Sequence, residues 1–201
     1  MNSDAASSSR PIIVAVAGPN GAGKSTVAPA LLEGTLGVTQ FVNADVIAQG
    51  LAGFSPETVA IEAGRIMLRR IKSLAARGLS FAFETTLSSR TFAPWLRGLA
   101  SSGYTVAVMY FWLPNVELAV RRVRSRVALG GHDVPEEIVR RRYRSSITNF
   151  MSLYAPQADA WWLYDNEGTG GPRLVATKHQ GLGLTVHDAS GWLAAKEASH
   201  G

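Results

Sequence analysis

Short apolar runs and longer segments of mixed polarity alternate along the chain. Five of the runs read as strands, at residues 12–17, 40–43, 79–84, 104–112 and 160–166. The segments between them carry apolar residues at helical spacing. This alternation predicts an α/β fold of the three-layer P-loop type, in which helices cover both faces of a mainly parallel, twisted sheet. The run at 104–112, YTVAVMYFW, is the most hydrophobic and is expected near the sheet centre.

Turn and capping residues set the expected limits of the helices. The stretch SPE at 55–57 predicts a helix start, and that helix should end before Gly78. In the stretch LGGHDVPEE, paired glycines break the chain, and Asp133 with Glu136 resembles a capping box for the helix that follows. The other expected helices lie at about 24–33, 91–100 and 114–127.

The last third of the chain predicts a buried helix face and an edge hairpin. Aromatic and apolar residues recur at helical spacing at positions 143, 147, 150 and 154, so one face of that helix should be buried. Trp161 and Trp162 are neighbours in a strand and should face opposite sides of the sheet. We expect a hairpin and a short helix over about 170–198. A single domain, 11–201, should follow a disordered tail at 1–10.

Composition limits the class of protein. The chain has 201 residues and no cysteine, which excludes disulfides and thiolate metal sites. Its first residues are polar, and the apolar run behind them, 12–17, is far too short to cross a bilayer, so we expect a cytoplasmic protein with no membrane segment. The net charge of +5 lies within residues 121–144, where eight arginines accompany three acids. This concentration suits a compact polyanion such as a nucleotide better than nucleic acid.

The stretch AGPNGAGKST after the first strand has the spacing of a P-loop. Its glycines allow backbone N–H groups to face phosphates at close range. Lys24 is expected to reach the β- and γ-phosphates of ATP, and the Ser25 hydroxyl is suited to ligate Mg²⁺. The candidate nucleotide-binding residues are Gly18, Pro19, Asn20, Gly21, Ala22, Gly23, Lys24, Ser25 and Thr26.

Carboxylates follow the second and third strands, at Asp45 and Glu84. Ligands of open α/β sheets collect at the carboxyl ends of the strands, so both acids are expected beside the P-loop. One could take the proton of an acceptor hydroxyl, and the other could orient metal or substrate. Asp45 could instead be a helix cap, Glu84 a surface acid, and Thr86 a turn residue rather than a substrate contact.

Two arginine groups flank the glycine break and predict a lid over about 121–145. Arg122 and Arg126 lie four residues apart, as do Arg140 and Arg144, so each pair shares a helix face. Such helices could close over phosphates, exclude water and neutralise charge. Arg124 or Arg126 is expected to serve from the first group and Arg140, Arg141 or Arg144 from the second. Many of the eight should simply be solvated.

In their order and spacing, GPNGAGKST, VNADVIA, FAFETTLSS and GGHDVPEEIVRRRYRSS resemble the zeta toxin family of P-loop kinases. The likeness covers about residues 12–166. It implies a kinase that uses ATP and Mg²⁺ to phosphorylate a sugar hydroxyl of UDP-N-acetylglucosamine, with an antitoxin protein as a partner. It also implies that Asp45 is the catalytic base, that Glu84 and Thr86 contact the sugar, and that the arginines surround the phosphates.

Two positions depart from that family. An arginine follows the acid and threonine almost at once in the toxins, whereas here Arg90 comes only after Leu87, Ser88 and Ser89. A carboxylate expected on the long helix falls on a leucine, and Arg65 of that helix could reach Glu84 or a substrate phosphate, or be exposed. Both changes are compatible with kinase chemistry, but they leave the identity of the phosphate acceptor undecided.

Two other functions compete with the kinase. A regulatory or nucleic-acid-associated P-loop ATPase would use Asp45 and Glu84 on Mg²⁺ and water, but no DNA-binding motif is present. A binding protein with a degenerate site is disfavoured by the complete P-loop.

Overall fold

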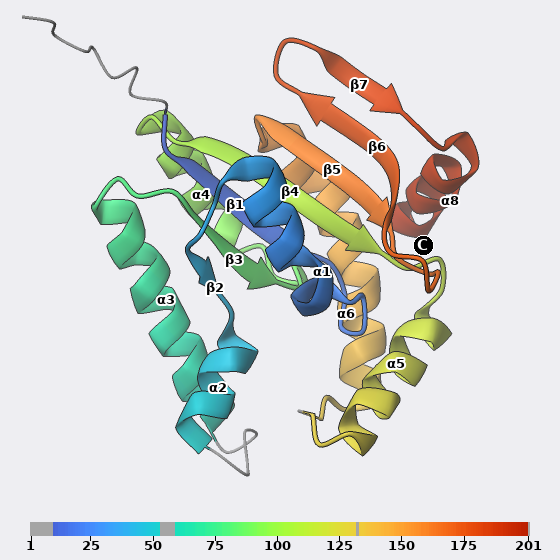
Figure 1. Cartoon of the computed structure of the whole chain (residues 1–201). Helices are drawn as coiled ribbons and strands as arrows, with labels where there is room; N and C mark the ends of the chain where they lie inside the picture. Colours follow the sequence, from blue (N-terminus) through green and yellow to red (C-terminus); the bar gives the residue numbers. More distant parts are fainter. Residues whose placement is uncertain (1–9, 53–58, 132, 201) are drawn as a thin grey trace, which may run out of the picture.

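Seven strands form one sheet within the described residues, in the order β2-β3-β1-β4-β5-β6-β7. The computed structural model describes residues 10–52, 59–131 and 133–200. Strand β1 (Ile12–Ala17) pairs in parallel with β3 (Phe81–Thr85) on one side and with β4 (Thr105–Trp112) on the other. β2 (Phe41–Val42) and β5 (Ala160–Asp165) extend this parallel part. β4 is therefore the central strand, as its hydrophobicity predicted (Figure 1).

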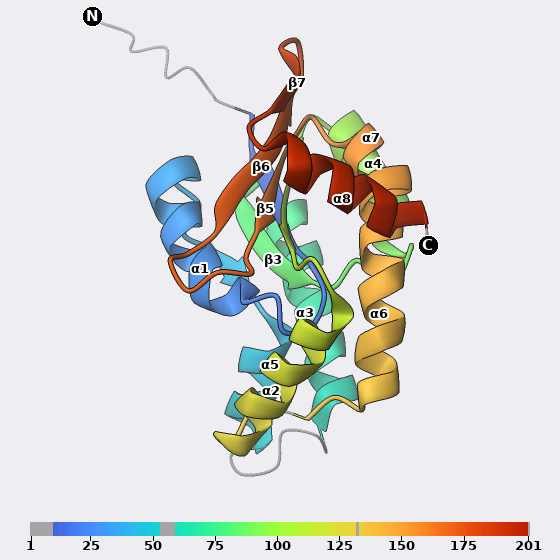
Figure 2. The same ribbon diagram turned by 90° about the vertical axis from the view of Figure 1, so that its right-hand side faces the viewer.

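An antiparallel hairpin completes the sheet. β6 (Arg173–His179) pairs with β5, and β7 (Gly183–Val186) forms the outer edge. Helix α8 (Ala189–His200) then packs against β6 and against α6 (Glu136–Asn149), as Figure 2 shows. The hairpin and the terminal helix predicted from the sequence are both confirmed.

Helices cover the two faces of the sheet. On one face, α1 (Lys24–Leu31), its π-helical continuation η1 (Leu32–Leu36) and α5 (Val116–Ala128) enclose one apolar core. On the other face, α3 (Ala60–Ala76), α4 (Phe92–Ser101) and α8 enclose a second core. The predicted three-layer α/β fold is confirmed (Figure 1).

Helix α6 contributes to both cores. Val139 and Tyr143 join the α5 side, whereas Ile147 packs with Phe150 and Tyr154 on the opposite side. The last two residues belong to the π-helix η3 (Phe150–Tyr154), which the short helix α7 (Ala155–Gln157) follows. All four residues predicted for the buried face of this helix are buried.

Two predictions about helix starts have different outcomes. The capping box at Asp133 and Glu136 is wrong, because α6 begins at Glu136 itself and Pro135 occupies the N-cap position without a side-chain cap. The predicted helix start at 55–57 and residues 1–9 of the tail predicted at 1–10 lie outside the described residues. Helix α2 (Ala44–Ala52) packs against α3.

No helix in the described ranges is both long enough and apolar enough to cross a membrane.

Candidate active site

The P-loop lies between β1 and α1, and two of its glycines are required by positive φ angles and close contacts. Gly18 has a φ of 139°, and a Cβ atom there would lie 2.2 Å from the carbonyl oxygen of Phe111 on β4. Gly23 has a φ of 76°, and a Cβ atom would lie 2.5 Å from Nδ2 of Asn166. Only glycine adopts these conformations readily. The loop therefore packs tightly against neighbouring elements and turns directly into α1.

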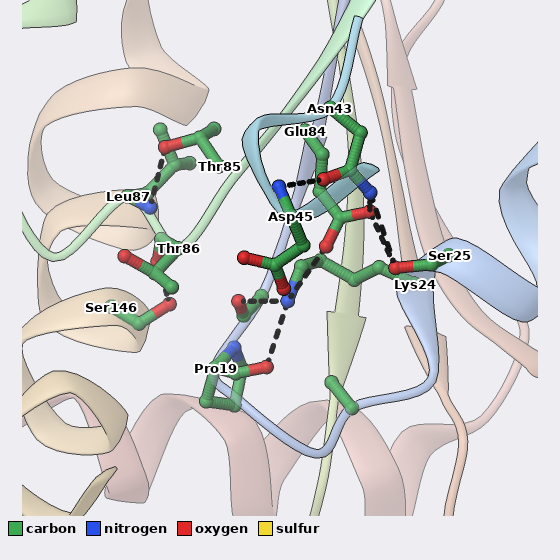
Figure 3. Close-up of polar contacts among 12 residues, drawn as sticks. Pro19, Lys24, Ser25, Asn43, Asp45, Glu84, Thr85, Thr86, Leu87 and Ser146 are labelled. Atoms are coloured by element: carbon green, nitrogen blue, oxygen red, sulfur yellow. Dashed lines mark hydrogen bonds and ion pairs between the residues drawn. The ribbon is translucent and has the colours of Figure 1, made fainter. Parts of the chain in front are cut away.

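Lys24, the first residue of α1, is almost fully buried. Its Nζ atom donates hydrogen bonds to the carbonyl oxygens of Gly18 and Pro19, both at 2.9 Å, and lies 3.7 Å from Oε1 of Glu84 (Figure 3). Burial lowers the pKa of Lys24, although the negative charges of Glu84 and Asp45 oppose this effect. The ammonium group is thus folded back onto the loop that it would leave to meet a phosphate.

Glu84, the penultimate residue of β3, lies at the centre of a polar cluster. Its Oε2 atom accepts a hydrogen bond from the Ser25 hydroxyl at 2.8 Å and another from Nδ2 of Asn43 at 2.7 Å (Figure 3). Hydroxyl and carboxylate oxygens are the ligands that Mg²⁺ takes in P-loop proteins, usually together with water and phosphate oxygens. Ser25 and Glu84 therefore fit a magnesium site beside the P-loop.

Asp45 lies in the first turn of α2 and faces the same cavity. Oδ1 of Asn43 accepts a hydrogen bond from the Asp45 backbone N–H at 2.7 Å, so Asn43 caps the helix and the Asp45 carboxylate is left for other contacts. That carboxylate is 44% exposed and lies 3.8 Å from Nη1 of Arg126. The capping role that the sequence allowed for Asp45 thus belongs to Asn43.

These groups line a cavity of about 680 Å³. Its walls come from the P-loop, the starts of α1 and α2, the end of β3, the arginine helices α5 and α6, and the loop after β5. Four lining residues are basic and two are acidic, so the cavity suits an anion. The charged lining residues are Lys24, Asp45, Glu84, Arg122, Arg126 and Arg142.

Several residues expected at the site lie elsewhere. Arg140 is held by both carboxylate oxygens of Glu117, at 2.6 and 2.9 Å, and by Glu136, while Arg124 pairs with Glu136 from the other side. These pairs tie α5 to α6 and turn Arg124 and Arg140 away from the cavity. Arg144 and Arg65 are exposed and are not among the cavity residues.

The loop after β3 is only partly brought to the cavity. Thr86 lines it, as expected, whereas Arg90 does not and instead donates a long hydrogen bond of 3.5 Å to Asn149. Arg126, Asp45 and Glu84 reach the cavity as the sequence predicted.

The cavity residues that were not selected from the sequence include Arg142, Arg122 and Asn166. Arg142 was passed over among its neighbours, although its pKa is lowered by burial, an effect strengthened by Arg141 and opposed by Asp45. Arg122 donates to the backbone carbonyls of Asn166 and Glu167, at 2.7 and 2.8 Å. Asn166 donates to the carbonyl oxygen of Ala22 at 2.8 Å and so supports the P-loop. A polar residue directly after β5 was the one available signal, because ligands collect at strand ends.

The parallel sheet, the P-loop turning into α1 and the acids at strand ends define a P-loop kinase-like fold of the NTPase class. The chain belongs to the AAA_33 family, described as an AAA domain, which matches residues 13–148, or about two thirds of it. An uncharacterized protein of Haemophilus influenzae is 29% identical over 126 residues, covering 63% of this chain and 88% of that protein.

Solved structures share the fold at low sequence identity. A chain of the AvrRxo1-ORF1:ORF2 complex with ATP superposes with a TM-score of 0.74 at 20% identity and covers 96% of this chain. The match spans 64% of that chain, which is less than two thirds of its length. A chain of the PezAT chromosomal toxin–antitoxin system of Streptococcus pneumoniae gives 0.65 at 15% identity, covering 96% of this chain and 80% of that one. The P-loop kinase-like part of the predicted resemblance is therefore confirmed.

Proposed function

We propose that this protein is an ATP- and Mg²⁺-dependent phosphotransferase that moves the γ-phosphate of ATP to a hydroxyl group of a small molecule. The observation that carries the proposal is the convergence of Lys24, Ser25, Asp45 and Glu84 on one cavity of about 680 Å³. Phosphoryl transfer needs charge neutralisation and an oriented nucleophile, and these side chains supply both. The AvrRxo1 complex with ATP, which shares the fold, supports the choice of nucleotide.

Each residue has a role that follows from its place. The P-loop amides and Lys24 bind the phosphates, and Lys24 exchanges the carbonyls of Gly18 and Pro19 for phosphate oxygens. Ser25, with Glu84 beside it, would hold Mg²⁺, whose charge would offset that of the β- and γ-phosphates. Asp45 accepts the proton of the acceptor hydroxyl.

The arginines of the lid divide between two tasks. Arg126 and Arg142 lie in the cavity wall and stabilise negative charge that develops during transfer. Arg124 and Arg140 maintain the spacing of α5 and α6 through their ion pairs with Glu117 and Glu136.

The acceptor is a nucleotide sugar such as UDP-N-acetylglucosamine, and an antitoxin protein is a partner. Both statements rest on the resemblance to the zeta toxin family in the motifs around Asp45, Glu84 and Thr86. The fold shared with the PezAT toxin–antitoxin system supports them. Glu84 is engaged by Ser25 and Asn43, so its part in sugar binding is secondary to its part at the metal.

The first prediction tests this function directly. Incubation with Mg-ATP and a panel of nucleotide sugars and nucleosides should give, by mass spectrometry, one acceptor with the mass of one added phosphate. Asp45→Asn should retain binding of ATP but lower transfer by about 10²-fold or more, the scale of general-base catalysis. Asp133→Asn, an equal change on an exposed loop residue, is the matched control. Unchanged transfer by the Asp45 variant would remove Asp45 from the mechanism, and rapid ATP hydrolysis with no phosphorylated acceptor would favour an ATPase.

A further inference from the structure

The loop that follows β3 is held from one side by a row of buried polar groups on α6 and η3. Ser146 donates a hydrogen bond to the carbonyl oxygen of Thr86 at 2.5 Å. Nδ2 of Asn149 donates to the carbonyl oxygen of Leu87 at 2.8 Å, and the Tyr154 hydroxyl donates to that of Ser89 at 2.7 Å. Three carbonyl groups within four residues of the loop are thus bound by side chains of one helical segment.

Ser146 is itself fixed by a second buried group. It is 0% exposed, and because its own proton points to Thr86, its oxygen accepts the hydrogen bond from the Tyr110 hydroxyl at 2.8 Å. Tyr110 lies on the central strand β4 and is fully buried, and burial raises its pKa. The hydroxyl therefore remains a donor, and the chain Tyr110–Ser146–Thr86 connects the sheet to the loop.

The loop needs this support because its backbone is unusual. Leu87 has a φ of 51°, in the left-handed region that a residue with a Cβ atom rarely adopts, and its side chain is 1% exposed. Such a strained backbone conformation persists only where several surrounding contacts hold it in place. Residues in such conformations are found most often at functional sites. Thr86, the residue immediately before, lines the cavity together with Asp45 (Figure 3).

We propose that Ser146 is a positioning residue for phosphoryl transfer, acting with Asn149 to hold the loop at 86–89 so that Thr86 faces the acceptor. The proposal rests on the phosphotransferase function above. Ser146 is not among the cavity residues, so its effect passes through the Thr86 backbone. Arg142 lies one helical turn before Ser146 on α6 and also lines the cavity. One helix therefore sets the positions of an arginine and of the acceptor loop.

The test compares Ser146→Ala with Ser145→Ala. The Ser145 hydroxyl donates only within its own helix, to the carbonyl oxygens of Arg141 and Arg142, so this neighbour is a matched control. Hydrogen–deuterium exchange of the 85–91 segment should become about tenfold faster in the Ser146 variant, because the loop opens locally once its anchor is lost, while exchange in the P-loop stays unchanged. The control should exchange as the wild type does.

Kinetics separate positioning from general stability. With the acceptor found in the panel, Ser146→Ala should raise the acceptor KM and lower kcat, together about 10²-fold in kcat/KM, because small displacements at a reacting centre have effects of this size. The Kd of a non-hydrolysable ATP analogue should stay within about twofold. Tyr110→Phe keeps the stacking on Phe150 and should give a smaller change in the same direction, which preserves the test if the Ser146 variant does not fold.

Two results would overturn the inference. One is exchange over 85–91 no faster in Ser146→Ala than in Ser145→Ala. The other is an equal weakening of ATP and acceptor binding, which a merely structural role would cause. The exchange measurement needs no acceptor. If the wild-type protein phosphorylates nothing in the panel, that result contradicts the proposed function. The hydrogen–deuterium exchange of residues 85–91 still tests whether Ser146 holds the loop.

Discussion

Lys24 has exchanged water for two carbonyl oxygens and one carboxylate, and this exchange determines its chemistry. The desolvation of its ammonium group is the largest influence on its pKa, which is lowered from the ordinary value of 10.5. Glu84 and Asp45 recover part of the loss. The hydrogen bonds and the acidic neighbours therefore keep a charged group inside the protein, although they do not fully offset its loss of water.

The lowered pKa of Lys24 predicts a pH dependence of stability. Between the lowered pKa and 10.5 the unfolded chain binds more protons than the folded one, so the free energy of unfolding should rise with pH in this window. Across this window the free energy of unfolding should rise by about 1.4 kcal/mol for each pH unit that separates the two pKa values. Lys24→Met removes the titrating group. In urea denaturation at pH 8, 9 and 10, the free energy of unfolding of the wild type should therefore rise relative to that of this variant.

Lys72→Met is the control for that series, because Lys72 is exposed on α3. Its stability should follow that of the wild type at every pH. A wild-type advantage over Lys24→Met that shrinks as the pH rises would contradict the burial of a charged lysine.

At the scale of elements, α5 and α6 act as one arginine-bearing unit because ion pairs join them. Arg140 contacts Glu117 on α5 and Glu136 on its own helix, and Arg124 contacts Glu136 from α5. Hydrogen bonds from Arg140 are the largest influence on the pKa values of Glu117 and Glu136, and both are lowered. The network fixes which helix faces point into the cavity.

This network explains why the sequence predicted the strands and P-loop well and the lid arginines less well. The apolar runs and the glycine–lysine spacing are local signals, and they gave β1, β4, α1 and the strand-end acids Asp45 and Glu84. Helical spacing predicts which arginines share a helix face, but it does not predict whether that face lies toward the cavity or toward solvent. The direction depends on Glu117, 23 residues from Arg140, and such a distant partner cannot be read from a single sequence.

A substitution at Arg140 tests the structural role of the network. Arg140→Met should change the Kd of an ATP analogue less than about twofold, since Arg140 does not line the cavity. It should lower the Tm at pH 7. That difference should shrink as the pH falls below 4.5, because the lowered carboxylate pKa values stabilise the fold only while Glu117 and Glu136 are ionised.

Arg144→Met, an equal change on an exposed residue of α6, is the control and should leave the Tm nearly unchanged at every pH. A loss of nucleotide affinity of tenfold or more in the Arg140 variant would instead restore Arg140 to the nucleotide site. Thermal unfolding and calorimetric titration on the same samples distinguish these outcomes.

Across the whole molecule, the carboxyl ends of the parallel strands gather groups that are far apart in the sequence. The P-loop follows β1, Glu84 is the penultimate residue of β3, and Asn166 follows β5 and binds the P-loop carbonyl of Ala22. Asp165, at the end of β5, binds Arg173 on β6 at 2.8 Å, so the C-terminal hairpin is attached to this same end. The parallel strands therefore bring the P-loop, Glu84 and the loop after β5 to the wall of the same cavity.

The positive charge of the chain is divided between that cavity and the outer surface, and the last prediction follows from this division. Arg126 and Arg142 line the cavity, whereas Arg121 and Arg144 are exposed on the same two helices. The double variants Arg126→Gln/Arg142→Gln and Arg121→Gln/Arg144→Gln remove equal charge. The first should weaken binding of a Mg-ATP analogue by about tenfold or more, because charge-assisted hydrogen bonds contribute roughly 1.5–3 kcal/mol each.

The second double variant should change the Kd by less than about threefold in 0.15 M salt, where exposed charges are screened beyond about 8 Å. Titration calorimetry at 0.05 and 0.15 M salt provides the measurement. Equal losses in both variants, growing equally at low salt, would mean that the general field of the arginine segment attracts the nucleotide. A loss confined to Arg126 and Arg142 would mean that the cavity wall itself binds the phosphates, as direct neutralisation during transfer requires.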